Sequence, residues 1–519
     1  EHIAMVNAST YTNESIDFGF SFDVVVNAKD VDDDSSSDRY AQGTLRQFIE
    51  NANAIIGKDR SYFVMMVNPN SQDSNGKWWS ITVNSSLGAL PTIKDNYTEL
   101  NGTVFYQNMS IRDENKGYVL YNYTTKKLES YNTQNEISVG VGGDGRPFSG
   151  DETKIRAVPK PEVEIYGNGN NIVLDVGANN CTISRLSIFG GNNFGIGVNN
   201  GDTLIKEVFV GLRANASDPN DSGLSRNKRG IVVVSSNTTI TDSITAFNNH
   251  TGISFGDTRV NSGAVKNVQA YKNGLAYDWG NGFIMEKEAS NITFENCLAS
   301  SNAGFGVDSF YGKEGLKVIN CTIEYNGRGK NSGGIRVLAN NSLIENNLIR
   351  NNNGSGVIIG RMKNYPTHGI NVTKNSIFNN TWIGIDIDPR LNNHDTYSGD
   401  NVTLNDGKLN SSQPNNGIDY PVINFSAFLN NKLYIMGYIN NESSTLGSSN
   451  FANAIVEFYV VNHDGEGDNL QGNNGYGEGY YYIGSLQADS NGNFEGSFNI
   501  DTSKVNVGDN ITATATLSN

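Results

Sequence analysis

Between Asp242 and Gly384 the chain repeats one short pattern six times: an Asn or Asp precedes one apolar strand, and a glycine precedes another. The Asn or Asp residues recur at steps of 24 to 29 residues, the length of one rung in a parallel β-solenoid. This repeat predicts the fold. The first set is Asp242, Asn267, Asn296, Asn320, Asn346 and Asn375, and the glycines are Gly252, Gly282, Gly306, Gly334, Gly356 and Gly384.

A single rung of this kind cannot bury its own apolar side chains, so neighbouring rungs must cover them. Asparagines at one turn of successive rungs are expected to stack and to bond through their side-chain amides. The glycines are expected at corners where φ is positive. Longer rungs, such as the one that carries NGLAYDWGNG at 273–282, are expected to place their extra residues in loops at the turns.

Composition agrees with a turn-rich β protein and excludes some partners. The 519 residues include 57 Gly, 77 Asn and 24 Tyr but only 10 Pro. A net charge of −16 and the lack of a basic stripe argue against nucleic acid as a partner and against binding to anionic membrane surfaces. No segment approaches the roughly 20 apolar residues that a membrane span needs.

One amphipathic helix is predicted near the N-terminus, in GTLRQFIENANAIIG at 43–57. Its apolar stripe has helical spacing and ends at Gly57. A lone helix before a solenoid is most simply a cap over the first rung, because an open end exposes strand edges. The acidic run before it, at 29–40, is interpreted as a solvated loop, with calcium binding as the alternative. The stripe consists of Leu45, Phe48, Ile49, Ala52 and Ile56.

Several motifs in combination resemble secreted prokaryotic right-handed parallel β-helix surface proteins. The segments DFGFSFDVVVN, GTLRQFIENANAIIG and ALPTI are similar to their N-terminal module, whose signature is GSLRQAIxxANA. After the repeats, GIDID, LNDG and GIDYPVI continue the likeness, and GYGEGYYYIGS, DSNGNFEGSF and VGDNITATAT resemble their small C-terminal β-sandwich. The resemblance implies large extracellular proteins, mostly adhesive or structural, without a common enzymatic activity.

The fold class predicted is therefore all-β: a right-handed parallel β-helix with an N-terminal cap helix and a C-terminal Ig-like β-sandwich. The expected divisions are an N-terminal region at 1–157, the β-helix at 158–395, a linker at 396–419 and the sandwich at 420–519. Because the chain stops soon after ITATAT, two alternatives are open: the terminus was cut or left unobserved, or the sandwich lacks its last strand and leaves an open edge. Residues Ile3, Ala4, Met5 and Val6 are the candidate strand donors from a neighbouring copy.

The compartment is inferred from asparagine. Asn-X-Ser/Thr sequons exceed the number expected by chance, which favours a secreted, N-glycosylated protein on the cell surface, with an archaeon as the favoured source. The predicted glycosylation sites are Asn7, Asn13, Asn84, Asn96, Asn101, Asn108, Asn122, Asn215, Asn220, Asn237, Asn249, Asn291, Asn371, Asn401, Asn410, Asn441 and Asn510.

The three cysteines, Cys181, Cys297 and Cys321, lie in strand-like segments and are interpreted as small buried side chains. Cys297 and Cys321 fall on adjacent rungs, so a disulfide between them is the alternative. Scattered histidines form no zinc motif. The tyrosines of GYGEGYYYIG are interpreted as cross-strand pairs in the sandwich, with a sugar-stacking platform as the alternative.

Candidate catalytic groups follow from strand alternation, which places Asp386 and Asp388 on one face about 7 Å apart. Asp308 and Arg336 are expected on neighbouring rungs. Outward carboxylates are normal on a solenoid, so these pairs permit catalysis without requiring it. A calcium-stabilised linker is the alternative use of the same region. Its candidate ligands are Asp386, Asp388, Asp395, Asp400 and Asp406.

The main functional expectation from the sequence is an extracellular structural subunit of a filament or surface layer, with no enzymatic activity. Copies of the chain would assemble head-to-tail. No cofactor is required, although calcium and N-linked glycans are compatible. Two alternatives stay open: an adhesin that binds glycans or cells, and a polysaccharide lyase or hydrolase.

Overall fold

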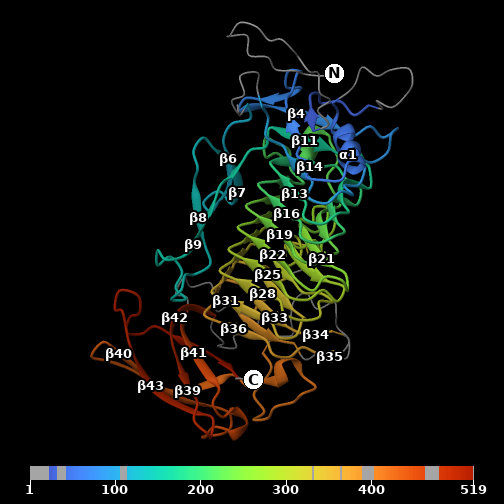
Figure 1. Cartoon of the computed structure of the whole chain (residues 1–519). Helices are drawn as coiled ribbons and strands as arrows, with labels where there is room; N and C mark the ends of the chain where they lie inside the picture. The colour runs from blue at the N-terminus through green and yellow to red at the C-terminus, as the bar shows by residue number, and fades with distance from the viewer. Residues whose placement is uncertain are drawn as a thin grey trace, which may run out of the picture. The chain divides into compact units, whose positions relative to one another are not determined.

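The computed structural model of the chain describes residues 23–31, 43–105, 114–329, 332–362, 365–388, 402–461 and 478–517. These residues form an all-β protein whose repeats stack as a parallel β-helix with three strands per rung, as the repeat predicts (Figure 1). The chain divides into two compact units. Unit 1 comprises Glu1–Asn135 and Ala157–Asn248, and unit 2 comprises Glu136–Arg156 and Asn249–Asn519.

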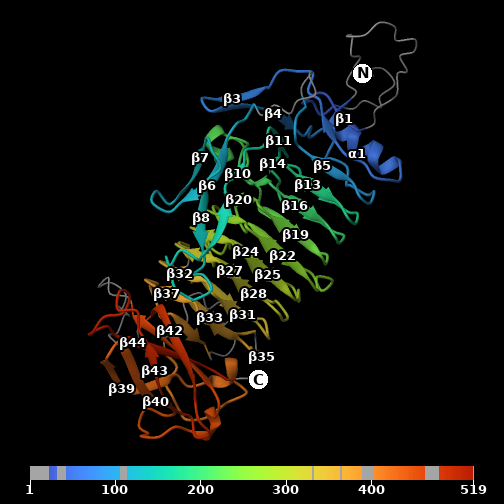
Figure 2. The same cartoon turned by 60° about the vertical axis from the view of Figure 1, so that its left-hand side comes forward.

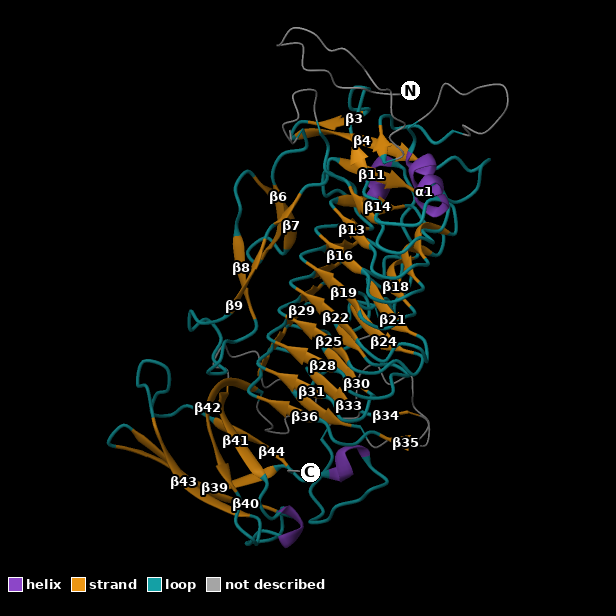
Figure 3. Cartoon of the chain, in the orientation of Figure 1, coloured by secondary structure: helices purple, strands orange, loops and turns teal. Residues whose placement is uncertain are grey.

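Unit 1 contains the predicted helix, α1 (Leu45–Ala54), drawn in purple in Figure 3. Thr44 caps its first turn, because the Thr44 hydroxyl oxygen accepts a hydrogen bond from the Gln47 backbone N–H at 3.1 Å. Four residues of the predicted apolar stripe are buried, but Ile56 is 94% exposed because the helix ends two residues before it. A capping role for α1 stays a prediction.

The strands of unit 1 stack in parallel ladders. One sheet follows the order β4-β11-β14-β17-β20, a second β12-β15-β18 and a third β5-β13-β16-β19. A short parallel pair, β1-β2, and a small antiparallel sheet, β10-β6-β7, complete the unit, and β3 pairs antiparallel with β4. The bounds are β1 (Val24–Val25), β2 (Tyr62–Phe63), β3 (Ser71–Asp73), β4 (Gly76–Thr82), β5 (Glu99–Asn101), β6 (Tyr118–Asn122), β7 (Lys127–Tyr131), β10 (Val158–Pro159), β11 (Val163–Tyr166), β12 (Ile172–Val176), β13 (Thr182–Ser184), β14 (Leu186–Phe189), β15 (Phe194–Val198), β16 (Leu204–Lys206), β17 (Phe209–Val210), the 3-10 helix η2 (Pro219–Ser222), β18 (Arg229–Val233), β19 (Thr238–Thr241) and β20 (Ile244–Ala246).

Unit 2 continues the same architecture in its own ladders, β22-β25-β28-β31-β36, β23-β26-β29-β32-β37 and β21-β24-β27-β30-β33-β38. Inward-facing residues at one register position stack from rung to rung and fill the interior. One such stack is Val265, Phe294, Val318, Ile344 and Val372. The bounds are β21 (Ile253–Gly256), β22 (Gly263–Lys266), β23 (Gln269–Tyr271), β24 (Phe283–Glu286), β25 (Ile292–Glu295), β26 (Leu298–Ser300), β27 (Val307–Asp308), β28 (Lys317–Ile319), β29 (Thr322–Glu324), β30 (Ile335–Val337), β31 (Leu343–Glu345), β32 (Leu348–Arg350), β33 (Val357–Ile359), β34 (Arg361–Met362), β35 (Tyr365–Pro366), β36 (Asn371–Thr373), β37 (Ser376–Phe378) and β38 (Ile385–Ile387).

The predicted turn residues do lie at one turn. Asn375 makes the expected bond to a neighbouring rung, its Oδ1 accepting from Asn347 Nδ2 at 2.9 Å, but Asn296, Asn320 and Asn346 do not form an amide ladder. Asn296, Asn320 and Asn346 adopt the left-handed conformation, with φ of 53°, 52° and 56°. In the last of the six rungs Lys374 holds that conformation, so the prediction for Asn375 was one residue too late. The side-chain oxygens of Asn296 and Asn346 have no hydrogen-bond partner among the described residues.

The asparagine ladder runs along a different corner, between the second and third strands of each rung. Each side-chain amide donates to the side-chain oxygen of the asparagine one rung on, at 2.9 or 3.0 Å. All members are at least nine-tenths buried, so the ladder satisfies polar groups that would otherwise be unpaired inside the protein. The members are Asn273, Asn302, Asn326, Asn352 and Asn380.

This ladder also explains the glycine column. None of the six glycines has a positive φ, so the predicted conformational reason is wrong. A Cβ at Gly306 would instead lie 2.4 Å from Ile323 Cγ2 and 2.8 Å from Asn326 Nδ2. A Cβ at Gly334 would lie 2.6 Å from the Gly356 carbonyl oxygen. At Gly282, Gly306, Gly334 and Gly356 the ladder and the next rung leave no space for a side chain, whereas the nearest atom to a Cβ at Gly384, in the last rung, would be 3.4 Å away.

A hairpin, β8 (Glu136–Val139) and β9 (Thr153–Arg156), belongs to unit 2 although it comes early in the sequence (Figure 2). At its tip the Gly140 N–H donates to Thr322 Oγ1 at 3.2 Å, and the Val141 N–H donates to the Asn346 carbonyl at 3.1 Å. The hairpin is thereby held against two successive rungs.

The C-terminal part of unit 2 consists of two three-stranded antiparallel sheets, β39-β40-β43 and β42-β41-β44. They share a core that includes Ile435, Val456, Phe458 and Phe494. Tyr459 and Tyr482 are cross-strand partners with ring centroids 5.6 Å apart, as the structural interpretation of these tyrosines predicts. The bounds are β39 (Pro421–Leu429), β40 (Lys432–Ile439), β41 (Ile455–Val461), β42 (Gly479–Gln487), β43 (Asn493–Asn499), β44 (Ile511–Thr516) and the 3-10 helices η3 (Pro414–Gly417) and η4 (Ser449–Phe451).

An Ig-like topology and the division boundaries given above stay predictions. None of the helices in the part of the chain that the structure describes is long and apolar enough to cross a membrane.

Candidate functional site

The carboxylates predicted from strand alternation lie together on β38 but are not accessible. Asp386 and Asp388 are 1% and 2% exposed. Because side chains alternate along a strand, they face away from their neighbours Ile385 and Ile387, which line a cavity. A buried carboxylate pair of this kind cannot reach a polysaccharide.

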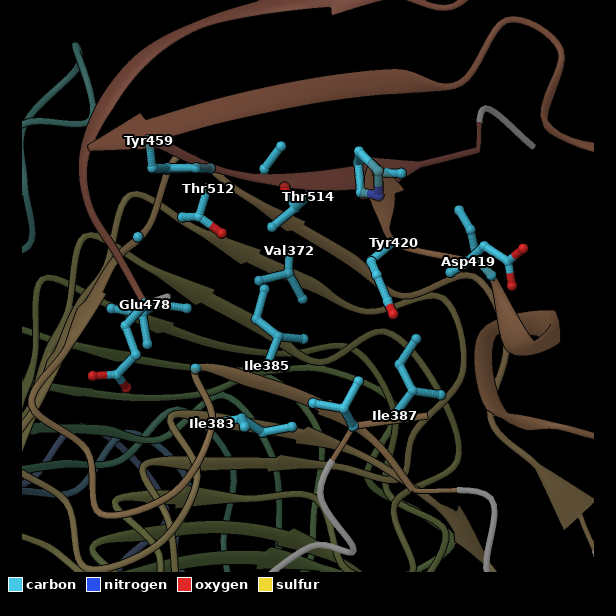
Figure 4. A pocket seen from close by; sticks show the side chains of 18 of the residues that line it. Val372, Ile383, Ile385, Ile387, Asp419, Tyr420, Tyr459, Glu478, Thr512 and Thr514 are labelled. Atoms are coloured by element: carbon cyan, nitrogen blue, oxygen red, sulfur yellow. The ribbon is translucent and has the colours of Figure 1, made fainter. Parts of the chain in front are cut away.

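That cavity, of about 780 Å³, lies between the last rung of the β-helix and the C-terminal sheets (Figure 4). Aliphatic side chains of the last rung form one wall, and β44 contributes Thr512 and Thr514 to the other. Glu478 and Asp419 lie at opposite ends in the view, and both already accept hydrogen bonds from protein groups. Burial raises the pKa of Asp419. Such apolar walls do not suit a hydroxyl-rich sugar.

Asp308 and Arg336 lie on adjacent rungs, as predicted, and they form a buried ion pair. Arg336 Nη2 is 2.8 Å from Asp308 Oδ2, and the two side chains are 5% and 2% exposed. The guanidinium also lies over the rings of Phe305 and Phe310, at 4.7 and 4.9 Å. Asn281 Nδ2 donates to the same carboxylate at 3.0 Å. The pair is therefore a packed structural element rather than a catalytic one.

Four of the predicted glycosylation sites (Asn7, Asn13, Asn108 and Asn401), the predicted strand donors Ile3–Val6, and the candidate ligands Asp395 and Asp400 lie outside the described residues. The other thirteen sequon asparagines are exposed or half-buried, and none is buried. Asp406 is exposed. Among residues that the structure describes, no group of three or more His, Cys, Asp or Glu is placed to hold a metal. Glycan occupancy and calcium stay predictions.

The three cysteines are buried free thiols, as predicted from their strand-like segments. Cys321 Sγ accepts a hydrogen bond from the Cys297 backbone N–H at 3.4 Å, which places the two on adjacent rungs. Burial raises the pKa of the Cys181 thiol to about 11 and that of Cys297 well above its ordinary value.

An exposed aromatic cluster, not singled out by the sequence, forms on the flank of unit 2. It consists of His250, Tyr277 and Trp279. The ring centroids of His250 and Tyr277 are 5.3 Å apart, and those of Tyr277 and Trp279 are 6.2 Å apart. Trp279 is 44% exposed, which is unusual for a side chain of this size.

The loop that carries Tyr277 and Trp279 joins β23 to β24, and two glycines lie in contact where it begins and ends. A Cβ at Gly280 would lie 2.3 Å from Gly274 Cα, and Gly274 has a φ of 85°. The Ala276 N–H donates to the Asn249 carbonyl at 3.0 Å. From the rungs beyond, Gly304 packs against the Trp279 backbone and Gly329 against that of Asp278. The loop is thus a packed platform.

Hydrogen bonds fix the tautomer of His250. The Trp279 indole N–H, which can only donate, lies 2.8 Å from His250 Nε2. Nε2 therefore accepts, and in the neutral ring the proton is on Nδ1, 2.8 Å from Thr251 Oγ1. His250 orients the indole ring, and its Nε2 cannot act as a general base while this bond holds.

Charged groups border the cluster. Asp278 lies between the two aromatic residues in sequence and is exposed. Arg328, from the loop two rungs further along, is anchored through Nε to the Ser301 carbonyl at 2.9 Å and through Nη2 to the Asn273 carbonyl at 3.3 Å. Beneath them, burial raises the pKa of Tyr271 to about 12, so this phenol stays neutral. The arrangement offers aromatic faces, a carboxylate and a cation at one exposed place.

A match to a family model described as "Right handed beta helix region" covers residues 261–432. Among solved structures, the A-module of a mannuronan C-5 epimerase from Azotobacter vinelandii is 15% identical, with a TM-score of 0.38, over 65% of this chain and 85% of that one. Tailspike protein 2 of an Escherichia coli O157:H7 bacteriophage is 12% identical, with a TM-score of 0.28, over 91% and 62%.

A tailspike of Acinetobacter baumannii bacteriophage Fri1, a capsular polysaccharide depolymerase, is 12% identical, with a TM-score of 0.26, over 88% of this chain and 78% of that one. At these identities the likeness concerns the fold alone. The family-model match agrees with a right-handed parallel β-helix, the predicted fold class.

The same matches correct the main functional expectation. They include proteins named as an epimerase and a depolymerase of polysaccharides. The expectation was a structural subunit of a filament or surface layer, without enzymatic activity. The sequence-based argument went wrong because it searched the repeated positions for chemistry. The aromatic and charged groups of the cluster lie on non-repeated loops, where residues from several rungs meet. The one available signal was the long insertion NGLAYDWGNG, with two aromatic residues around an aspartate.

Proposed function

We propose that this chain binds an extended polysaccharide on the flank of unit 2 and acts on it chemically, with the aromatic cluster as the binding surface. The observation that carries the proposal is the exposed indole of Trp279, held by the His250 imidazole beside Tyr277. Rigid aromatic rings with one polar edge suit a sugar, whose C–H face packs on the ring while its hydroxyls bond to polar neighbours.

The groups bordering the cluster favour acid–base chemistry. The Asp278 carboxylate is the candidate base, the Tyr277 phenol is the candidate acid, and Arg328 can neutralise negative charge on a bound sugar. His250 is a positioning residue, because both of its ring nitrogens are engaged. Bond cleavage and epimerisation use the same three kinds of group, so the product identifies the reaction. An extracellular location belongs to this proposal and is favoured by the sequon density.

Binding to a panel of acidic and neutral polysaccharides tests the proposal. Trp279→Ala is expected to weaken binding by roughly tenfold or more, because a central exposed aromatic dominates such a contact. Tyr434→Ala is the matched control, since Tyr434 is also an exposed aromatic, 39% exposed, on a strand of the C-terminal sheets. Equal binding by both variants, or no binding to any glycan, contradicts the proposal.

Product analysis tests the chemistry. Chain length by chromatography reports cleavage, ultraviolet absorbance reports an unsaturated product, and NMR of the polymer reports epimerisation. Asp278→Asn is expected to abolish turnover and to leave binding nearly unchanged, because the carboxylate is assigned to proton transfer and the rings to binding. Tight binding with no product from any polymer would reduce the site to a lectin.

A further inference from the structure

A second pocket lies in unit 1, on the outer face of the sheet β5-β13-β16. Its volume is about 370 Å³, at the low end of the range for ligand sites. Its floor is one register column in which Asn101, Ser184 and Lys206 follow each other on successive rungs. The remaining lining residues are Arg60, Glu99, Thr103, Phe105, Arg185 and Glu207.

The pocket concentrates positive charge in an acidic chain. Arg185 Nε lies 2.7 Å from Glu207 Oε2, and Arg60 Nε lies 3.5 Å from Glu99 Oε1. Lys206 takes part in no ion pair among the described residues. The pocket therefore holds three cations against two carboxylates, while the whole chain has a net charge of −16. The ammonium of Lys206 is therefore available to form an ion pair with an anionic group of a ligand.

Below the lysine is an unsatisfied hydroxyl. Ser184 is 1% exposed, and its Oγ has no hydrogen-bond partner among the described residues. Leaving a buried hydroxyl unpaired costs free energy, so native structures rarely do so without a ligand or water to complete the bond. Ser184 lies directly between the Asn101 amide and Lys206 in the column, which places this hydroxyl on the pocket floor.

The walls add the features of a sugar site. Phe105 lines the pocket, and its ring centroid is 6.0 Å from that of Tyr62, which is 38% exposed. Glu99 and Glu207 can accept hydrogen bonds from ligand hydroxyls. They would repel a ligand made only of anionic oxygens, such as phosphate or sulfate. A ligand with one carboxylate and several hydroxyls fits this lining, because the carboxylate can pair with Lys206 and the hydroxyls can donate to Glu99 and Glu207.

We propose that this pocket binds a uronic acid residue of an acidic polysaccharide. Lys206 pairs with the sugar carboxylate, and Ser184 and Asn101 donate hydrogen bonds to oxygens of the sugar. The two glutamates accept hydrogen bonds from the sugar hydroxyls, and Phe105 packs against the sugar ring. The inference stands apart from the aromatic cluster, because it uses other residues in the other unit. It also requires Asn101 to be free of glycan, although Asn101 belongs to a sequon.

Calorimetric titration with trigalacturonate and with its fully methyl-esterified form tests the proposal, because the two probes share their rings and differ in charge. The protein is expected to prefer the acid form, and Lys206→Gln is expected to lose roughly ten- to a hundredfold in affinity for it. Lys94→Gln, an exposed lysine of the same unit, is the control with unchanged affinity. Ser184→Ala is expected to weaken binding of trigalacturonate too, but by a smaller factor than Lys206→Gln.

Running the titrations in a Trp279→Ala background separates the two sites, since loss at the aromatic cluster leaves the dependence on Lys206 in place. Three outcomes would overturn the inference. These are equal affinity for the two probes, inorganic phosphate binding as tightly as trigalacturonate, and mass spectrometry that finds a glycan on Asn101 of the native protein.

Discussion

Asn380 Nδ2 lies 3.0 Å from Glu478 Oε1, and this bond ends the buried asparagine ladder of the β-helix. The Asn380 backbone N–H also points to this carboxylate, at 3.2 Å from Oε2. Each asparagine donates to the next rung, so the last one needs an acceptor that the repeat cannot supply. A residue just before β42 supplies it, which links the end of the solenoid to the C-terminal sheets.

Removing this acceptor should destabilise unit 2. Glu478→Ala leaves the buried Asn380 backbone N–H without its acceptor, while Asn380 Nδ2 keeps the Ile349 and Phe378 carbonyls, and the expected loss is about 1–3 kcal/mol in the free energy of unfolding. Glu478→Gln should lose less, because its amide oxygen still accepts. Chemical denaturation provides the measurement, with Glu495→Ala as an exposed control on β43. If Glu478→Ala and Glu495→Ala unfold alike, the ladder needs no terminal acceptor.

The glycine column should not tolerate a methyl group. Gly306→Ala places a Cβ 2.4 Å from Ile323 Cγ2, so a loss of about 1–3 kcal/mol is expected from overpacking. Gly143→Ala is the matched control, because nothing lies within 4 Å of its Cβ position, and a change within about 0.5 kcal/mol is expected. Thermal unfolding of the two variants should therefore separate them clearly; a tolerated alanine at 306 would show that the rungs can move apart.

Removing one partner of the buried pair of Asp308 and Arg336 should lower the free energy of unfolding strongly. Removing both should lower it much less. Arg336→Met leaves the Asp308 carboxylate buried without its cation, at an expected cost of about 3–5 kcal/mol. The double variant Asp308→Leu with Arg336→Met should recover much of this. Arg259→Met controls for arginine removal, since the pair of Arg259 with Asp257 is 61% and 32% exposed. A double variant as unstable as the single one would contradict this account.

Asp59 should make the stability of the protein depend on pH. Burial, followed by repulsion from Asp23 and Asp95, raises the pKa of Asp59 from 3.8 to about 6. The folded state therefore holds this proton more tightly than the unfolded chain. Its stabilising effect is fully present below about pH 4 and is lost as the pH rises through about 6.

Asp59→Asn should accordingly stabilise the protein at pH 7.5 and have little effect at pH 3.5, as measured by denaturant unfolding at both values. Asp202→Asn, at an exposed aspartate, is the control and should show no such difference between the two pH values. A stabilisation of equal size at both pH values would assign the effect to packing instead of ionisation.

The cysteines should not react in the folded protein. A thiolate is the reactive form, and the raised pKa values of Cys181 and Cys297, together with the burial of all three, keep the thiols protonated and covered. Ellman's reagent at pH 8 should therefore label none of them in the native state and all three after denaturation. Only one reactive thiol in the denatured, unreduced protein would indicate a disulfide between Cys297 and Cys321.

Of the candidate sites, only the one built from repeated positions could be predicted from the sequence. The pairing of Asp308 with Arg336 could be anticipated, because the rung length places them one repeat apart. The aromatic cluster could not, because His250, Trp279 and Arg328 come from three different rungs and belong to no repeated position. The pocket of unit 1 likewise depends on the register that aligns Asn101, Ser184 and Lys206, and Asn101 lies 83 residues from Ser184 in the chain.

The sequence by itself determined the architecture, because a rung is a local object: its strand alternation, its left-handed turn and its glycine all lie within 24 to 29 residues. Only the tertiary structure decided which asparagines form the ladder and why glycine is needed beside it. Each rung carries asparagines at more than one turn, and a lone rung has no preference among them. Stacking selects the column in which five successive amides meet in a buried corner that excludes a side chain from the glycine opposite.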